Sequence, residues 1–312
     1  MVLSKTNLYE QLIDILEKDN VIKDKALKNH TYTRLGGAAD FFVTPVTYEQ
    51  VQQVVILANK ENIPFTLLGN GSNLIIRDGG IRGIVMYLGK LSNITVEETK
   101  MIAQSGALIA EASKEALQSN LTGLEFACGI PGSVGGALFM NAGAYGGEIK
   151  DVLTKAKVIT SSGEMKTILA EDLDLDYRTS NIPDNGYIVL EGEFQLEKGD
   201  YQEIKAVMDD LTYKRESKQP LEYPTCGSVF KRPLGYFAGK LIQDSGLQGK
   251  QIGGAEVSMK HAGFIINKDN ASANEYITLI EYVQKVVKEK FSVELEREVR
   301  IIGEDVKETT ER

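Results

Sequence analysis

The segment from Gly123 to Ile149 constrains the chain more than any other stretch, because small residues dominate it. It reads GLEFACGIPGSVGGALFMNAGAYGGEI, and its few polar groups suited to binding an anion are Ser133, Asn141 and the backbone N–H groups. Residues without side-chain bulk let the backbone approach a ligand closely and permit turns with φ > 0. Successive N–H groups in a turn form an anion-binding concavity. The segment therefore predicts a site for a diphosphate.

A tightly packed structural turn is the alternative interpretation of this segment, and the residues alone leave it open. A membrane span is excluded, because Pro131, Asn141 and the scattered glycines interrupt any run of about 18 apolar residues. We therefore expect no membrane partner.

The composition is that of an ordinary globular protein, with 42% hydrophobic and 25% charged residues. A net charge of −9 argues against nucleic acid as the main partner, because binding to phosphates needs a basic surface. The cysteines are Cys128 and Cys226, and the histidines are His30 and His261. So few of these residues suggest no disulfide framework and no metal site. We expect small buried thiols in a reducing cytoplasm.

The first residues do not read as a signal peptide, because acidic residues interrupt them and no apolar core region follows. Leucines and isoleucines between Leu8 and Leu16 recur at helical spacing instead, which predicts an amphipathic helix. A strand at 39–44 follows, then a helix from Thr47 to about Asn59. Thr47 and Gln50 are predicted to form its capping box.

A second glycine-containing loop, Gly69 to Leu74, follows a short apolar strand at 63–68. It is a poor Rossmann fingerprint, because Leu74 stands where the third glycine belongs and a β-branched run follows in place of a helix. A strand–loop–strand that presents N–H groups, asparagines and a serine to a phosphate is the better interpretation.

The middle of the chain predicts further strands and helices. Strands are expected at 83–87, 94–96, 101–104, 152–160, 164–168 and 187–196, with a helix at about 107–118. The polar loop 175–181 contains one cation, Arg178. Asp200 is predicted to cap a helix that runs to about Arg215, and the main domain boundary is expected near residue 200.

The last third has a different character, because cations outnumber acids between Lys214 and Lys240. These cations flank the turn-forming segment 223–230, so a solvated surface and an anionic ligand are both open interpretations. Helices are expected at about 239–244 and from Ser272 or Asn274 to about Lys290. Apolar and charged residues then alternate from Val293 to Ile301. This period of two predicts a strand that places Glu298 and Arg300 on the same face.

These segments together resemble the UDP-N-acetylenolpyruvoylglucosamine reductase family, a flavoenzyme family of bacterial peptidoglycan precursor synthesis. The resemblance covers about residues 29–303. It is carried by motifs in the family's order: Gly69–Leu74, Gly129–Gly136 with Asn141–Gly143, Tyr177-Arg178, Cys226–Phe230 and Glu298–Arg300. The family has a longer branch with an inserted tyrosine loop. Residues 187–201 leave no room for that loop, so the chain resembles the shorter branch.

The resemblance implies an α+β fold with an FAD-binding domain of the vanillyl-alcohol-oxidase type and a smaller α+β substrate domain. The expected division is an N-terminal helix at 1–28, an FAD-binding domain at 29–200 and a substrate domain at 201–303. Subdomains are expected at about 29–90 and 91–200, and a charged, frayed tail at 304–312. Non-covalently bound FAD is the expected cofactor, and NADPH the expected hydride donor. The implied cofactor-binding residues are Gly69, Asn70, Gly71, Ser72, Asn73, Leu74, Ile130, Pro131, Gly132, Ser133, Gly135, Gly136, Asn141, Ala142 and Gly143.

The resemblance also implies a reaction in two halves. NADPH reduces FAD, and the flavin N5 then delivers a hydride to C3 of the enolpyruvyl ether of UDP-N-acetylglucosamine. Negative charge that develops at C2 and its carboxylate needs a fixed cation or proton donor, and the implied groups are Arg178 and Glu298. Glu298 must then be protonated, so its pKa should be raised. Ser228 matches the family's proton donor to C2, and the product is UDP-N-acetylmuramate.

Arg215, Arg232 and Arg300 are predicted to bind the diphosphate or carboxylate of the substrate, because arginine forks match such oxygens. The implied roles are in cell-wall biogenesis, cell shape and cell division. Lys260-His261 is expected to close or support the substrate domain, and His261 is assigned no catalytic part. Two other functions stay open, an FAD-dependent oxidase of an alcohol or hydroxy acid and a non-catalytic flavin-binding or nucleotide-binding sensor.

Overall fold

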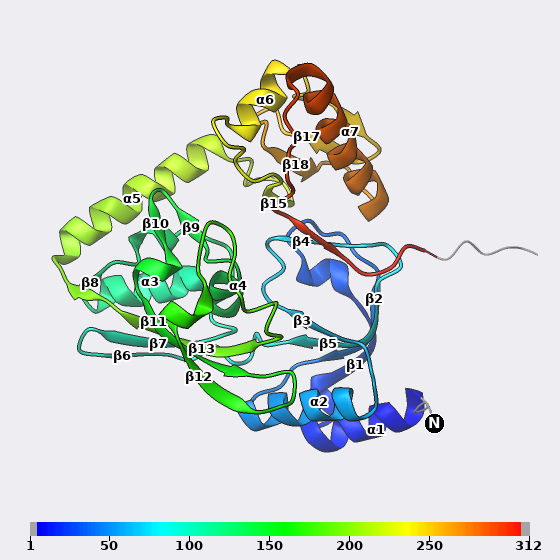
Figure 1. The fold of residues 1–312 in the computed structure, drawn as a ribbon, viewed down its shortest axis with the longest axis vertical. Helices are drawn as coiled ribbons and strands as arrows, with labels where there is room; N and C mark the ends of the chain where they lie inside the picture. Colours follow the sequence, from blue (N-terminus) through cyan, green and yellow to red (C-terminus); the bar gives the residue numbers. More distant parts are fainter. Residues whose placement is uncertain (1–4, 307–312) are drawn as a thin grey trace, which may run out of the picture. The chain divides into compact units, whose positions relative to one another are not determined.

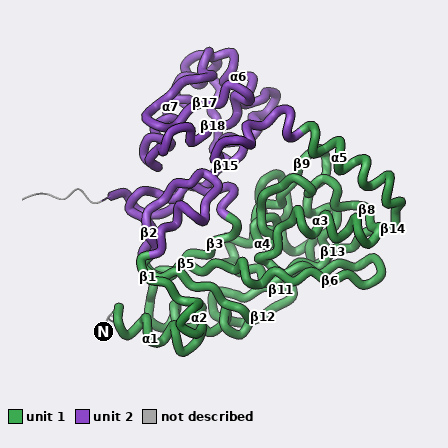
Figure 2. Tube along the Cα trace, turned by 180° about the vertical axis from the view of Figure 1, so that it is seen from behind, with its two compact units in different colours: residues 1–24, 40–70, 83–214 green, residues 25–39, 71–82, 215–312 purple. Residues whose placement is uncertain are grey.

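The computed structural model describes residues 5–306, which form two compact units (Figure 2). Unit 1 holds the described residues up to Asp24 together with 40–70 and 83–214. Unit 2 holds 25–39, 71–82 and the described residues from Arg215 on. Unit 2 is therefore assembled from three separate stretches of the sequence.

Two amphipathic helices of unit 1, α1 (Lys5–Leu16) and α2 (Tyr48–Lys60), lie side by side (Figure 1). They pack with a sheet of strand order β1-β2-β5-β3. Its strands are β1 (Val21–Ala26), β2 (Ala38–Val43), β3 (Phe65–Leu68) and β5 (Ile81–Tyr87). Leu12, Val51 and Ile84 are 0% exposed in this core, because both helices turn their apolar faces inward.

A second sheet of unit 1 is antiparallel, with the order β12-β11-β13-β7-β6. Helices α3 (Ile109–Gln118) and α4 (Val134–Phe139) pack on it through a shared apolar core (Figure 1). The glycine-rich segment thus supplies a short helix directly after the loop 129–133. The strands are β6 (Ile94–Glu97), β7 (Lys100–Gln104), β11 (Leu153–Ile159), β12 (Met165–Leu169) and β13 (Ile188–Gln195).

Unit 2 contains an antiparallel sheet of order β15-β18-β17-β16, with α6 (Ala238–Asp244) and α7 (Ala273–Phe291) packed in the same core. Its strands are β15 (Thr225–Ser228), β16 (Gln251–Ile252), β17 (Ala255–Val257) and β18 (Phe264–Asn267). A separate parallel pair joins β4 (Leu74–Ile76) to β19 (Arg300–Ile302). The residue that follows the Gly69–Asn73 loop is therefore paired with a strand close to the end of the described chain.

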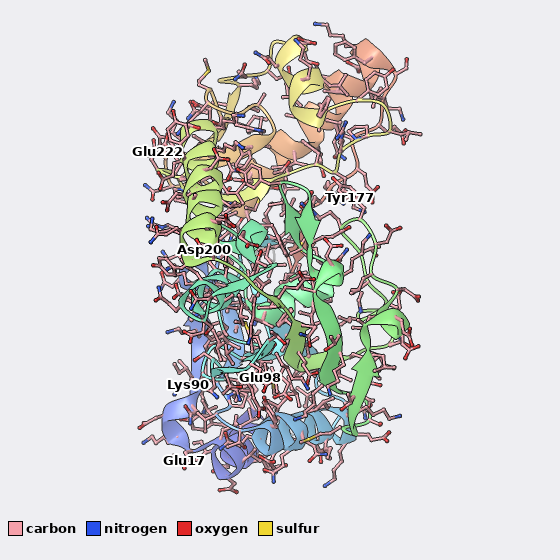
Figure 3. All side chains as sticks on the ribbon, turned by 90° about the vertical axis from the view of Figure 1, so that its left-hand side faces the viewer. Glu17, Lys90, Glu98, Tyr177, Asp200 and Glu222 are labelled. Atoms are coloured by element: carbon pink, nitrogen blue, oxygen red, sulfur yellow. The ribbon has the colours of Figure 1, made fainter. Side chains whose placement is uncertain are left out.

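Helix α5 (Tyr201–Lys218) begins after Asp200, whose carboxylate accepts from the N–H groups of Gln202 and Glu203 at 2.9 and 3.1 Å. Asp200 is labelled at this end of the helix in Figure 3. The remaining elements are short: strands β8 (Leu121–Thr122), β9 (Gly143–Ala144), β10 (Gly147–Glu148) and β14 (Glu197–Lys198), and 3-10 turns Lys18–Asn20, Leu27–His30, Glu125–Ala127, Ile149–Asp151 and Ala170–Leu173. Between residues 5 and 306 no helix combines the length and the apolar composition that a bilayer crossing requires.

The α+β class and most predicted helices and strands are confirmed, but the long final strand is wrong. Only Arg300–Ile302 is a strand, and before it the backbone makes a single bridge, from Arg297 to Phe230. The predicted turn-forming segment 223–230 contains strand β15. Strand β1 and the short helix α4 were not predicted.

Two smaller expectations are only partly met. Thr47 caps α2 by accepting from Gln50 N–H at 3.2 Å, but the Gln50 side chain accepts from Val46 and not from Thr47, so no capping box forms. The tail was predicted to be frayed from residue 304, but Glu304 forms a backbone bridge with Gly80. The rest of that tail from residue 307, like residues 1–4 of the predicted N-terminal helix segment, lies outside the described residues. The predicted domain division stays a prediction.

Candidate active site

The loop before α4 contains backbone N–H groups that are available to bind a ligand. Ser133 caps the helix by accepting from Gly136 N–H at 3.3 Å, and the Val134 and Gly135 N–H groups donate to carbonyl oxygens of residues 107 and 105. Within the described chain, the N–H groups of Gly132 and Ser133 have no protein acceptor. These two adjacent donors are the groups that could hold a phosphate oxygen.

The first part of the Gly69–Leu74 loop lies against this segment in unit 1. The Asn70 side-chain amide donates to the Pro131 carbonyl oxygen at 2.6 Å. A Cβ atom on Gly69 would come to 3.0 Å from Ser133 Oγ, so the two loops approach each other closely at this position. The structure thus brings together two loops that lie about 60 residues apart in the sequence and that were both predicted to bind phosphate.

The second part of that loop belongs to unit 2 and contacts the C-terminal segment. The Asn73 amide donates to the Glu298 carbonyl oxygen at 3.1 Å, and the Asn73 carbonyl accepts from Arg300 N–H at 3.2 Å. Gly71 has φ +66, and a Cβ there would lie 2.0 Å from the His30 carbonyl oxygen. The end of the predicted cofactor loop is therefore hydrogen-bonded to the segment that contains Glu298, the predicted catalytic glutamate.

Asn141 has a structural function in the described chain. It is 0% exposed, and its amide donates to Glu148 at 2.7 Å and to the Asp176 carbonyl at 3.1 Å. Its side-chain oxygen accepts from Lys150 N–H at 2.9 Å. The side chain is thus fully bonded within the protein, and a cofactor-binding role for Asn141 would rest on its backbone.

Arg178 lies in a tight turn that the glycine-rich segment holds. Asp176 and Thr179 form an isolated bridge around it, and Arg178 has φ 56, a left-handed conformation that is rare for a large side chain. Its guanidinium donates to the Gly143 carbonyl at 2.7 Å and lies 5.4 Å from the ring centre of Tyr177. Tyr177, labelled in Figure 3, is 49% exposed. The strained turn and the hydrogen bond to the Gly143 carbonyl together fix the position of the Arg178 guanidinium.

Ser228 ends strand β15 at an irregularity. Thr225 and Ser228 pair with Ile266 and Phe264 of β18, with a register shift between them. Gly227 occupies φ +81 inside this shift, which glycine adopts without strain. Ser228 is half-buried, and its hydroxyl donates to the Phe230 carbonyl at 3.3 Å. A bulge of this kind redirects a side chain out of the regular strand pattern.

Glu298 is joined to the Ser228 segment through one residue, Val229. The Val229 carbonyl accepts from Glu298 N–H at 2.9 Å and from Val299 N–H at 3.4 Å. Val229 is 0% exposed, whereas Glu298 is half-buried. Unit 2 therefore brings the predicted proton donor and the predicted catalytic glutamate, separated by about 70 residues in the sequence, onto neighbouring stretches of backbone.

The predicted substrate arginines lie in different settings. Arg300 is exposed at the start of β19, and Arg215 lies in the last turn of α5. Arg232 stacks at 3.9 Å on the exposed ring of Phe237. Three lysines of the cationic stretch pair with acids: Lys214 with Asp210, Lys231 with Glu296 and Lys240 with Asp244. The planar fork of an arginine side chain matches carboxylate and phosphate oxygens, so binding of an anion by these three arginines stays a prediction.

A wide hollow in unit 1 does not suit a diphosphate. It has a volume of about 920 Å³, and its lining includes Lys150, Asp151, Asp174, Asp176 and Asp184. So many carboxylates repel an anion. Among residues 5–306 no group of three or more His, Cys, Asp or Glu side chains could hold a metal ion.

No role was predicted for Val229 or Gly263, yet their backbone groups connect the segments that contain Ser228 and Glu298. The Val229 N–H donates to the Gly263 carbonyl at 3.0 Å, while its own carbonyl accepts from Glu298. No local signal reveals such contacts, because each partner lies more than 30 residues away and the bonds involve only backbone groups.

Comparisons with known proteins give a consistent picture. A family model described as UDP-N-acetylenolpyruvoylglucosamine reductase, C-terminal domain, matches residues 219–302, and an FAD binding domain model matches residues 39–169. The chain is 70% identical over 299 residues to a UDP-N-acetylenolpyruvoylglucosamine reductase of Oceanobacillus iheyensis, covering 96% of this chain and 97% of that one. A Geobacillus kaustophilus protein of the same name is 65% identical over 298 residues, covering 96% and 98%. The crystal structure of the Thermus caldophilus reductase superposes with a TM-score of 0.77 at 32% identity, covering 90% of this chain and 97% of that chain.

Proposed function

The chain belongs to the UDP-N-acetylenolpyruvoylglucosamine reductase family, and from that premise we propose that it uses NADPH to reduce the enolpyruvyl ether of UDP-N-acetylglucosamine to UDP-N-acetylmuramate. It is an FAD-containing oxidoreductase of peptidoglycan precursor synthesis. We infer that it acts in the cytoplasm and supports cell-wall growth, and through it cell shape and division. Two free cysteines, Cys128 and Cys226, agree with a reducing compartment.

The residues present fit a bound FAD. The adjacent N–H groups of Gly132 and Ser133 lack acceptors within the described chain, and the Asn70 amide bonds the same loop at Pro131. These groups and the backbone of Gly69 would hold the diphosphate. When bound, FAD supplies the hydride, received from NADPH, that is delivered from N5 to C3 of the enolpyruvyl group.

The observation that carries the proposed chemistry is the backbone link between Ser228 and Glu298. Because Glu298 N–H bonds the carbonyl of the residue after Ser228, the two side chains come from adjacent positions in one unit. We assign to Ser228 Oγ–H the transfer of a proton to C2. Glu298 and Arg178 are assigned the stabilisation of negative charge on C2 and its carboxylate.

A serine hydroxyl is a weak acid, so it donates a proton only to a strongly basic carbon. The proposed mechanism therefore needs a charge at C2 that the carboxylate delocalises only in part, with cations near the resulting alkoxide. Arg300 lies two residues after Glu298, and its N–H donates to the Asn73 carbonyl. We propose that Arg300, Arg215 and Arg232 bind the carboxylate or the diphosphate of the substrate.

Stopped-flow absorbance of the bound flavin separates the two half-reactions and tests the assignment of Ser228. In Ser228→Ala, NADPH should bleach the flavin at a rate within about twofold of the wild type. Reoxidation by the enolpyruvyl substrate without oxygen should be slower by about 10²–10⁴-fold, the usual contribution of a general acid. Ser245→Ala, a matched serine at the end of α6, should change neither rate. Equal losses in both half-reactions of Ser228→Ala would count against the assignment.

A further inference from the structure

His261 accepts a hydrogen bond that shapes the turn beside Ser228. Its Nδ1 atom accepts from Gly263 N–H at 3.1 Å, two residues along the chain. The ring packs edge-on against Phe264, with ring centres 4.8 Å apart. On the other side of the turn, the 1% exposed Ser258 hydroxyl accepts from the N–H groups of Lys260 and His261 at 3.1 and 3.3 Å. The turn is therefore fixed from two directions.

Gly263 lies between the imidazole ring and the serine hydroxyl. A Cβ atom at this position would stand 3.1 Å from His261 Cε1 and 3.7 Å from Ser228 Oγ. The bare α-carbon thus faces both side chains at once. The next residue, Phe264, pairs with Ser228 in the sheet.

A continuous chain of hydrogen bonds then runs from the histidine to the glutamate. Gly263 donates its N–H to His261 and accepts from Val229 N–H at 3.0 Å, and the Val229 carbonyl accepts from Glu298 N–H at 2.9 Å. Val229 directly follows Ser228, so the position of Gly263 is coupled to the backbone of the serine through one hydrogen bond.

We propose that His261 is a positioning residue for the proton transfer, because its Nδ1 acceptor fixes Gly263 and, through Val229, sets Ser228 against Glu298. This inference rests on the proposed function of Ser228. His261 itself gives no proton to the substrate.

The protonation state of the imidazole agrees with this role. Only a neutral imidazole has a ring nitrogen that can accept, because both nitrogens of the cation carry hydrogens. Burial lowers the pKa of His261, which favours the neutral form at neutral pH.

A pair of substitutions separates the hydrogen bond from the packing of the ring. His261→Phe keeps a ring of similar size but has no acceptor. His261→Asn loses the ring, but its side-chain oxygen can accept from the N–H two residues along, as in an Asx turn. Substrate-driven reoxidation of the flavin should be at least about fivefold slower in the Phe variant than in the Asn variant. Reduction by NADPH should stay within about twofold in both. The fivefold difference corresponds to about 1 kcal/mol, the net value of one neutral hydrogen bond.

A double-mutant cycle with Ser228→Ala provides the second readout. If His261 acts through the serine, His261→Phe should slow reoxidation no further once the hydroxyl is absent. Equal rates in the Phe and Asn variants, additive losses in the cycle, or equal slowing of both half-reactions would each overturn the inference. If the Phe variant does not fold with flavin, His261→Leu provides the acceptor-free comparison. A wild-type protein whose reduced flavin is not reoxidised by the substrate would instead refute the proposed function.

Discussion

Substitution of Gly71 by alanine should damage the protein more than its backbone conformation alone requires. Gly71 has φ +66, and a Cβ there would lie 2.0 Å from a backbone carbonyl oxygen and 2.9 Å from a backbone α-carbon. A left-handed conformation costs a non-glycine residue about 1–2 kcal/mol. Overpacking against backbone that cannot rotate away adds about 1–3 kcal/mol. The expected loss in the free energy of unfolding is thus about 2–5 kcal/mol.

Gly246 is a matched control in the same unit. It has φ +74, but nothing lies within 4 Å of the position that a Cβ would take, so Gly246→Ala reports the conformational cost alone. Thermal unfolding of the FAD-free variants gives the comparison, at about 2–4 °C per kcal/mol for a domain of about 150–250 residues. Because Gly71 belongs to the proposed cofactor loop, titration with FAD should also show weaker binding in Gly71→Ala but not in Gly246→Ala. Equal shifts in both variants, with unchanged FAD affinity, would refute the reasoning.

Two further predictions concern buried groups of unit 2. Tyr276, 0% exposed on α7, donates its hydroxyl to a backbone carbonyl, so Tyr276→Phe should lower the free energy of unfolding by about 0.5–1.5 kcal/mol in urea titrations. Tyr282→Phe on the same helix, where the side chain is 38% exposed, should cost less than about 0.5 kcal/mol; equal costs would contradict this expectation. Burial raises the pKa of the Cys226 thiol from 9.0 to about 11, so at a pH of about 8 a thiol reagent should label the half-buried Cys128 first and Cys226 only on unfolding. The folded state favours the neutral Cys226 thiol, so this contribution to stability is present below pH 9.0 and is lost as the pH rises toward about 11; urea midpoints that do not fall in this range would contradict it.

Local chemistry made most helices predictable from the sequence. The apolar spacing of Ile277, Ile280 and Val283 predicted the buried face of α7, and all are at most 5% exposed. Ser272 caps that helix in a capping box with Glu275. Caps and helical periodicity depend on neighbours within about four residues, so a sequence displays them directly.

The strands of unit 2 were harder to predict, because their partners are remote. The alternation from Val293 to Ile301 is genuine, yet only Arg300–Ile302 finds a strand partner, in β4 near the start of the unit. The segment around Ser228 was expected to be a turn, because Gly227 and Pro224 favour one. In the structure Gly227 instead adopts a positive φ at the register shift of strand β15.

The candidate site shows the same limit. The glycine-rich segment and the Gly69–Leu74 loop were both predicted to bind phosphate, and the bond from Asn70 to Pro131 brings them together. The roles of Ser228 and Glu298 came only from the resemblance, since each side chain alone is an ordinary turn serine or strand carboxylate. Their connection through Val229 depends on backbone bonds across about 70 residues, which no local pattern encodes.

A single anaerobic turnover tests the proposed reaction most directly. The purified protein should show a flavin spectrum, lose it on addition of one equivalent of NADPH, and regain it when the enolpyruvyl ether of UDP-N-acetylglucosamine is added without oxygen. One equivalent of UDP-N-acetylmuramate should form, as measured by mass spectrometry. A flavin that stays reduced until oxygen restores it, or a protein that binds no FAD at all, would contradict the proposed reaction.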